Sequence, residues 1–112
     1  MIPMLSLRHI VVVQYKVDFR RWHDGLLAEC YRLELDPYRG DVILFIGRCR
    51  RRIKLVFADS NGLWVAAKRF NSGALKTKFR FLDDPTYTAV SQAELAMFIE
   101  GNAFRIEAKI AA

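Results

Sequence analysis

The sequence predicts an α+β fold, in which an antiparallel meander sheet of about four to five strands carries an N-terminal amphipathic helix and a C-terminal helix. Three observations support this prediction. Short runs rich in Val, Ile, Leu and Phe recur between residues 42 and 81, a pattern typical of strands. Apolar residues recur at helical spacing after Asp18, which indicates an amphipathic helix. A Ser-x-x-Glu signal opens a second helical segment near the C-terminus, as expected of a capped helix.

The length and composition limit the class of protein. The 112 residues predict a single domain, residues 1–112, because this length suffices for one hydrophobic core. With 53% hydrophobic and 27% charged residues, the composition is typical of a globular protein. No uncharged apolar run approaches the roughly 20 residues of a membrane-spanning helix, and the N-terminus lacks the marks of a signal peptide. We therefore expect a cytoplasmic protein with no membrane partner.

The first expected elements are a strand and a helix. Residues 8–15 (RHIVVVQY) are rich in β-branched side chains, which favour a strand. Asp18 follows at the position of a helix N-cap, and the helix should end before Asp36 and Pro37, because a residue that precedes proline avoids the α region. Gly25 inside the helix indicates close approach to a strand or a need for bare backbone. The apolar stripe of this helix consists of Phe19, Trp22, Leu26, Cys30 and Leu33.

Two apolar strands, expected at residues 42–47 and 52–59, enclose a run of arginines, and a third strand follows Asn61 and Gly62. The Asn-Gly pair favours a two-residue type I′ turn, in which both central residues have positive φ. One face of the resulting hairpin is apolar near the turn and basic at the open end. The cross-strand pairs expected from such a turn are Ala58 with Val65, Val56 with Ala67, and Lys54 with Arg69.

Residues 75–81 (LKTKFRF) alternate between apolar or small and basic side chains. This alternation predicts a half-buried strand whose outer row contains Lys76, Lys78 and Arg80. Two interpretations of the outer row stay open. Its basic side chains either discourage edge-to-edge aggregation of an edge strand or extend a basic face that binds a ligand.

Sequence signals at both ends mark the C-terminal helix. Ser91 and Glu94 form the pattern of a capping box, in which each side chain accepts a hydrogen bond from the backbone of the other. The segment QAELAMFIE should bury Leu95, Phe98 and Ile99. Gly101 is then expected to end the helix, and the tail beyond it either adds a strand or stays loose.

Residue types that carry catalysis or bind metals show no recognisable arrangement. The sequence contains no Gly-rich phosphate loop, no Ser-His-Asp arrangement and no spacing of metal ligands. Cys30 and Cys49 are far apart in the sequence and are expected to be free thiols. The arginines on either side of Cys49 favour its thiolate, but no catalytic base lies beside it. We therefore expect no enzymatic activity, no metal, no cofactor and no small-molecule substrate.

The net charge of +6 favours a nucleic acid or an acidic protein as partner. Most of the clustered basic residues flank the expected hairpin, where they could form a patch that faces phosphates. In the alternative interpretation, their charged ends extend into water while their stems cover apolar surface. The candidate nucleic-acid-binding residues are Arg48, Arg50, Arg51, Arg52, Lys54, Lys68 and Arg69, together with Arg20 and Arg21.

Three ordered segments, DFRRWHDGL, LDPYRGDVILFIGRCRRRIKLVFADSNGLWVAAKRF and AELAMFIEG, resemble a known family across about residues 2–105. This family is the small accessory protein, often called TnpB, of bacterial insertion sequences of the insertion-sequence-66 family. The chain departs from the family pattern at Phe19 and Trp22, and at residues 76–78 in place of an aromatic-proline segment. The matching residues are Asp18, Arg20, Asp24, Gly25 and Leu26 in the first motif, Asp36, Pro37, Gly40, Phe45, Arg48, Arg52, Ile53, Lys54, Leu55, Asp59, Gly62, Leu63, Lys68 and Arg69 in the second, and Leu95, Met97, Glu100 and Gly101 in the third.

The resemblance implies an accessory factor of transposition that is encoded beside a separate, larger transposase of the DDE type. Two hypotheses about its role stay open. In the first, the protein contacts DNA through the basic residues given above. In the second, it docks on the element-encoded transposase without binding DNA, with Trp22, Trp64 and the hairpin edge as anchors. A third possibility is a decayed copy that folds but has no present function.

Overall fold

The computed structural model describes residues 9–48, 50–71, 78–80, 87–100 and 105–107. No helix within these ranges is long and apolar enough to cross a membrane. The elements in chain order are β1 (His9–Val17), α1 (His23–Arg32), the 3-10 helix η1 (Pro37–Arg39), β2 (Asp41–Gly47), β3 (Arg52–Ala58), β4 (Leu63–Arg69), β5 (Lys78–Arg80), β6 (Tyr87–Ala89), α2 (Gln92–Glu100) and β7 (Arg105–Glu107).

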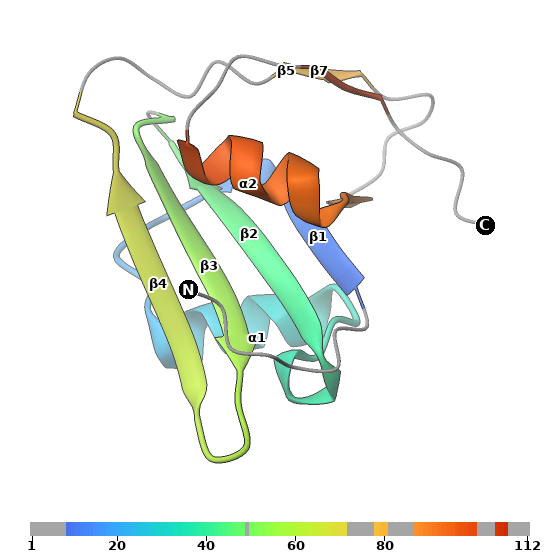
Figure 1. Ribbon diagram of the computed structural model, residues 1–112. Coiled ribbons are helices and arrows are strands. Elements are labelled where there is room, and N and C mark those ends of the chain that lie inside the picture. Colours follow the sequence, from blue (N-terminus) through green and yellow to red (C-terminus); the bar gives the residue numbers. More distant parts are fainter. Residues whose placement is uncertain (1–8, 49, 72–77, 81–86, 101–104, 108–112) are drawn as a thin grey trace.

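Five strands form a sheet in the order β4-β3-β2-β1-β6, and α1 and α2 cover its opposite faces (Figure 1). The α+β class is confirmed, and β2, β3 and β4 pair as an antiparallel meander. The prediction that the whole sheet is antiparallel is wrong, because β1 and β2 pair in parallel. The physical reason is that α1 lies between these two strands in the chain. Such a crossover returns the chain to the same end of the sheet, so the second strand runs in the direction of the first.

The sheet has a hydrophobic core on each face. The central strand β2 is buried at every position, as expected of a strand covered on both sides. Its residues alternate between the two cores: Leu44 packs with Phe98 of α2, whereas Ile43 and Phe45 pack with Leu26 of α1. We refer to these faces as the α2 side and the α1 side of the sheet.

Helix α1 begins later than the sequence predicts. Its N-cap residue is Trp22, which makes no side-chain cap, whereas the predicted cap, Asp18, accepts a hydrogen bond from the backbone nitrogen of Arg20 at 3.0 Å. Asp18 therefore organises a local turn, and residues 18–22 form a loop, here called the β1–α1 loop. The predicted end of the helix before Pro37 is confirmed, since α1 stops at Arg32.

The hairpin of β3 and β4 has a longer connection than predicted. Neither Asn61 nor Gly62 has a positive φ, so the type I′ turn is wrong. Instead, the Asp59 carboxylate accepts hydrogen bonds from the Asn61 backbone nitrogen at 3.0 Å and the Trp64 indole nitrogen at 2.8 Å. The connection therefore spans residues 59–62, and the predicted pairs are wrong by two positions. The observed pairs include Ala58 with Leu63, Val56 with Val65, Lys54 with Ala67, and Arg52 with Arg69.

The predicted C-terminal helix is confirmed as α2. The Ser91 nitrogen donates to Glu94 Oε1 at 2.8 Å, and the Glu94 nitrogen donates to Ser91 Oγ at 3.0 Å, so the capping box forms. The expected C-terminal Gly101 lies outside the described residues. So does much of the strand predicted at residues 75–81, of which β5 is described, pairing in parallel with β7.

Candidate nucleic-acid interface

A surface hollow of about 470 Å³ lies at the end of the sheet where β1, β2 and β4 finish and β3 starts. Five arginines line it, and we call it the arginine hollow. They come from the β1–α1 loop, the turn between β2 and β3, and the facing ends of β3 and β4. The residues that line the hollow are Val17, Asp18, Phe19, Arg20, Gly47, Arg48, Arg51, Arg52 and Arg69.

The backbone brings these arginines together in three ways. The parallel pairing of β1 and β2 places the carboxyl ends of both strands at the same end of the sheet. The turn after β2 is tight, because the Arg50 nitrogen donates to the Gly47 oxygen at 3.0 Å and Arg50 has a φ of 59°. Finally, Arg52 pairs directly with Arg69 across the open end of the hairpin. Cross-strand like charges are unfavourable, so this pair favours a negative ligand above it.

One carboxylate enters the arginine hollow. Arg20 binds Asp18 in a forked arrangement, with Nε and Nη2 at 2.9 and 2.7 Å from Oδ2. The hydrogen bonds from the Arg20 side chain and backbone lower the pKa of Asp18 to about 2, so this carboxylate stays charged at neutral pH. Within the described residues, no carboxylate lies within ion-pairing distance of the other four arginines. The arginine hollow therefore retains an excess of positive charge.

The inner wall of the hollow is apolar and tightly packed. The ring of Phe19 lies against Gly47: a Cβ added at Gly47 would lie 3.1 and 3.2 Å from two carbons of that ring. Glycine at this position therefore lets the β1–α1 loop approach the end of β2 closely. This contact places Asp18 and Arg20, which flank Phe19, at the rim of the hollow.

Lys54 does not line the arginine hollow. The residue is only 3% exposed, and its ammonium nitrogen donates to the backbone oxygens of Phe19 and Arg21 at 2.8 Å each. The same nitrogen lies 3.5 Å from the ring centroid of Trp22, within the range of a cation–π interaction. Burial, followed by repulsion from Arg52, lowers the pKa of Lys54. Lys54 thus holds the β1–α1 loop onto the sheet beside the hollow.

Two further basic residues from the sequence-based set have other partners. Lys68 donates to the backbone oxygen of Ile99 near the end of α2, and its ammonium lies 5.2 Å from the centroid of the Phe70 ring. Arg21 pairs with Glu29 of α1 at 2.8 Å. The structure thus gathers Arg20, Arg48, Arg51, Arg52 and Arg69 in the hollow, places Arg50 in the adjoining turn, and separates Lys54, Lys68 and Arg21 from the hollow.

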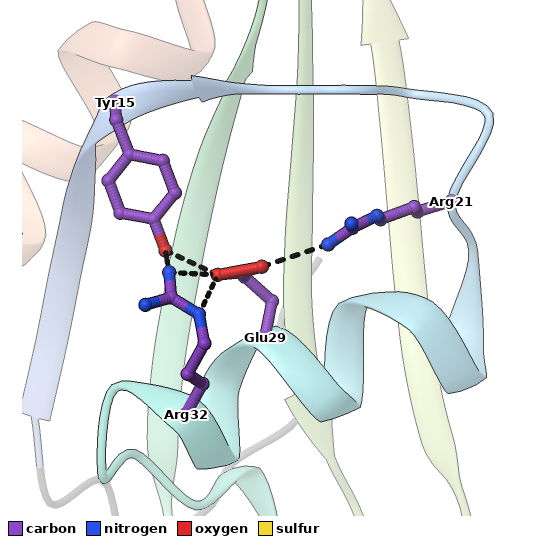
Figure 2. A network of polar contacts seen from close by, with 4 residues as sticks. All are labelled: Tyr15, Arg21, Glu29 and Arg32. Carbon is purple, nitrogen blue, oxygen red and sulfur yellow. Dashed lines mark hydrogen bonds and ion pairs between the residues drawn. The ribbon is translucent and has the colours of Figure 1, made fainter.

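Sequence reasoning missed a polar network on the α1 side, shown in Figure 2. The Tyr15 hydroxyl donates to Glu29 Oε2 at 2.6 Å, and Arg32 Nε donates to the same oxygen at 2.7 Å. Burial and the Glu29 hydrogen bond raise the pKa of Tyr15 to about 12. Burial opposes ionisation of Glu29, but the hydrogen bonds that Glu29 accepts from Tyr15, Arg32 and Arg21 outweigh the effect of burial. The pKa of Glu29 is therefore lowered. Glu29 and Arg32 have the i,i+3 spacing of a helical ion pair, a local signal that could have been found. Tyr15 and Arg21 precede α1, and only the fold brings them to Glu29.

Other reactive groups show no catalytic arrangement in the described ranges. No cluster of three His, Cys, Asp or Glu residues suited to a metal ion occurs there. Cys30 is fully buried on α1, and burial raises the pKa of its thiol to about 12, which suppresses the reactive thiolate. Cys49, the cysteine of the basic turn, lies outside the described residues.

Comparison with known proteins finds a matching family and a curated relative. Residues 8–108 match a family described as IS66 Orf2 like protein. The chain is also 36% identical over 72 residues to the uncharacterized protein y4jC of Sinorhizobium fredii. That alignment covers 63% of this chain and 61% of the relative, so the chain spans less than two thirds of the relative's length. No solved structure matches.

Proposed function

The chain belongs to the IS66 Orf2-like family, and from this premise we propose that it is a non-catalytic accessory factor of transposition that contacts DNA phosphates through the arginine hollow. The strand-transfer chemistry would belong to a separate transposase encoded by the same element. Family membership supports the role in transposition. The gathering of five arginines around one hollow supports the contact with DNA.

The chemistry of the hollow suits phosphate groups. A guanidinium group donates two parallel hydrogen bonds to phosphate oxygens and keeps its charge at any physiological pH. Arg48, Arg51, Arg52 and Arg69 are exposed, so a ligand can reach them without a rearrangement of the sheet. Their mutual repulsion is relieved when an anion binds between them. A DNA strand supplies such anions at regular spacing, and each phosphate contact releases counterions.

The second candidate function is docking on the transposase through aromatic anchors. Trp22 and Trp64 are each 50% exposed, and partly exposed tryptophans are frequent anchors of protein interfaces. Each ring is already fixed from one side: Trp22 lies over Lys54, and Trp64 stacks on Phe57 with centroids 5.9 Å apart. Such rigid rings lose little conformational entropy on binding. The two functions are compatible, because the arginine hollow uses neither tryptophan.

Fluorescence anisotropy of a labelled DNA duplex, measured across a salt series, tests the proposed function. The comparison is between the wild-type protein and a triple variant, Arg48→Gln, Arg51→Gln and Arg69→Gln. We expect the wild-type affinity to fall steeply with salt, and each lost phosphate contact to reduce the log–log slope by about 0.9. Absence of wild-type binding at low salt would overturn the DNA role and direct attention to the transposase.

A further inference from the structure

Strand β4 forms one edge of the five-stranded sheet, and in the described part of the chain no strand pairs with its outer side. Natural sheets protect such an edge with short strands, prolines, bulges or charged side chains. β4 has seven residues, LWVAAKR. It contains no proline, it pairs with β3 without a shift in register, and its charges stand only at its last two positions. β4 is therefore an open edge that suits the addition of another strand.

The side chains of β4 leave this edge flat and partly apolar. On the α2 side, Trp64 is half exposed and Ala66 is exposed, since the buried residues of α2 pack on the inner strands. On the α1 side, Leu63 and Val65 pack only partly into the core. Alanines at positions 66 and 67 let a second strand approach without steric conflict. Main-chain hydrogen bonds could then extend the sheet.

The charges along β4 are opposite at its two ends, so two antiparallel copies of this edge have complementary charges. Asp59, just before β4, holds the indole nitrogen of Trp64 at 2.8 Å, and hydrogen bonds from Trp64 and from backbone amides lower the pKa of Asp59. Lys68 and Arg69 lie at the other end of the strand. When two copies of β4 run antiparallel, the acidic end of each lies beside the basic end of the other. Parallel pairing would instead bring like charges together.

We propose that a second copy of this chain pairs with the outer edge of β4, antiparallel and centred on Ala66, and forms a twofold-symmetric dimer with a continuous sheet. In this register Ala66 faces its own copy, Val65 faces Ala67, and Trp64 faces Lys68. The stem of Lys68 covers the exposed indole, and its ammonium has donors left beyond the bond to Ile99 for the Asp59 carboxylate. A symmetric interface of this kind closes without further growth.

The dimer would also arrange the arginine hollows, a consequence that rests on the proposed function, whereas the pairing itself does not. A twofold axis perpendicular to the sheet keeps the α1 sides of both copies on the same face. Arg69 lies three residues from Ala66, so the two Arg69 positions would be about 20 Å apart along the strands. Two hollows held in one dimer would bind one duplex more tightly than either alone.

Sedimentation velocity of the full chain without DNA tests the pairing. The wild type should dimerise with increasing concentration. Ala66→Glu and Ala66→Lys should each raise the dimer dissociation constant about fivefold, because like charges then face each other at the axis. An equal mixture of the two variants should restore the dimer, since opposite charges then meet. Ala96→Glu, a matched charge change on the exposed side of α2, should leave dimerisation unchanged, and circular dichroism checks that all variants fold.

Three outcomes would overturn this inference. The first is a wild-type protein that stays monomeric at every concentration, which would leave the edge to another protein, such as the transposase, or to another segment of this chain. The second is a dimer that neither Ala66→Glu nor Ala66→Lys weakens, which would place the interface elsewhere. The third is two variants that are monomeric alone and remain monomeric when mixed, which would exclude the register centred on Ala66.

Discussion

The ammonium nitrogen of Lys54 lies 3.5 Å from the centre of the Trp22 ring and donates to two backbone oxygens of the β1–α1 loop. The loop in turn carries Asp18, Phe19 and Arg20 to the arginine hollow. Lys54 thus stabilises the loop that forms one wall of the hollow, while the arginines supply the accessible positive charge of the hollow.

Replacing Lys54 separates these two roles. Lys54→Met keeps a long apolar side chain but removes the donor, so the two carbonyl oxygens lose their partner. We expect the free energy of unfolding, measured by urea titration, to fall by about 1–3 kcal/mol. The salt slope of DNA binding should stay close to that of the wild type. A variant with wild-type stability and a slope reduced by about 0.9 would contradict this role and make Lys54 a phosphate contact.

The Glu29 network predicts a loss of stability in acid. The folded state lowers the pKa of Glu29 below its ordinary value of 4.5, so the carboxylate contributes stability above that pH, and this contribution is lost as the pH falls through the folded pKa. Glu29→Gln should therefore lower stability at pH 7 and flatten the decline in acid. Urea unfolding at several pH values measures both effects. Asp24→Asn, which removes an exposed carboxylate of the same helix, is the matched control for the loss of a charge. A pH profile of Glu29→Gln equal to that of the wild type would contradict the prediction.

Two glycines should respond in opposite ways to alanine. Gly47→Ala places a Cβ 3.1 Å from the Phe19 ring, and overpacking of this kind costs about 1–3 kcal/mol. At Gly62 the nearest atom, Asp59 Oδ1, would be 3.9 Å away, and φ is not positive there. Gly62→Ala should thus be neutral or stabilise by about 0.4–1 kcal/mol. Thermal unfolding of both variants gives the comparison, and equal stabilities would argue against the close contact at Gly47.

Asp18 limits the positive charge of the hollow, because it occupies the guanidinium of Arg20. Asp18→Asn keeps an oxygen that can accept from the Arg20 backbone nitrogen but removes the negative charge. We expect tighter DNA binding and a log–log salt slope that increases by about 0.9, since Arg20 becomes available for a phosphate. Weaker binding by a variant with wild-type circular dichroism would show that Asp18 positions Arg20 for the ligand instead.

Signals within a short stretch of sequence predicted their elements well. Ser91 and Glu94 lie three residues apart, and both hydrogen bonds of the capping box are present. The end of α1 before Pro37 and the strands on either side of the arginine turn were also predictable, because backbone restriction and apolar runs act locally. The charge cluster at the open end of the hairpin could be anticipated too. Within it, Arg69 pairs across the strands with Arg52 rather than with Lys54.

Relationships between distant residues were not predictable in this way. The order strand, helix, strand from β1 to β2 is compatible with a parallel crossover, but this order alone does not fix the direction of the second strand. The alternation around Lys54 indicates a polar face, yet the β1–α1 loop covers that face in the fold. Gly25 likewise faces the stem of Arg21 rather than a strand, since a Cβ added at Gly25 would lie 3.1 Å from the Arg21 Cβ. Each of these outcomes depends on tertiary packing, which no local pattern contains.

The most direct test of the central claim compares single arginines inside and outside the hollow. Arg51 lines the hollow, whereas Arg39 lies on η1 before the opposite end of β2, with its side chain 75% exposed. Arg51→Gln and Arg39→Gln lower the net charge of the protein by the same amount. Duplex binding across a salt series therefore separates the effect of an arginine's position from the effect of net charge. We predict a slope reduced by about 0.9 for Arg51→Gln and little change for Arg39→Gln. Equal effects of the two variants would contradict the account, because binding would then follow the overall charge of the protein rather than the arginine hollow.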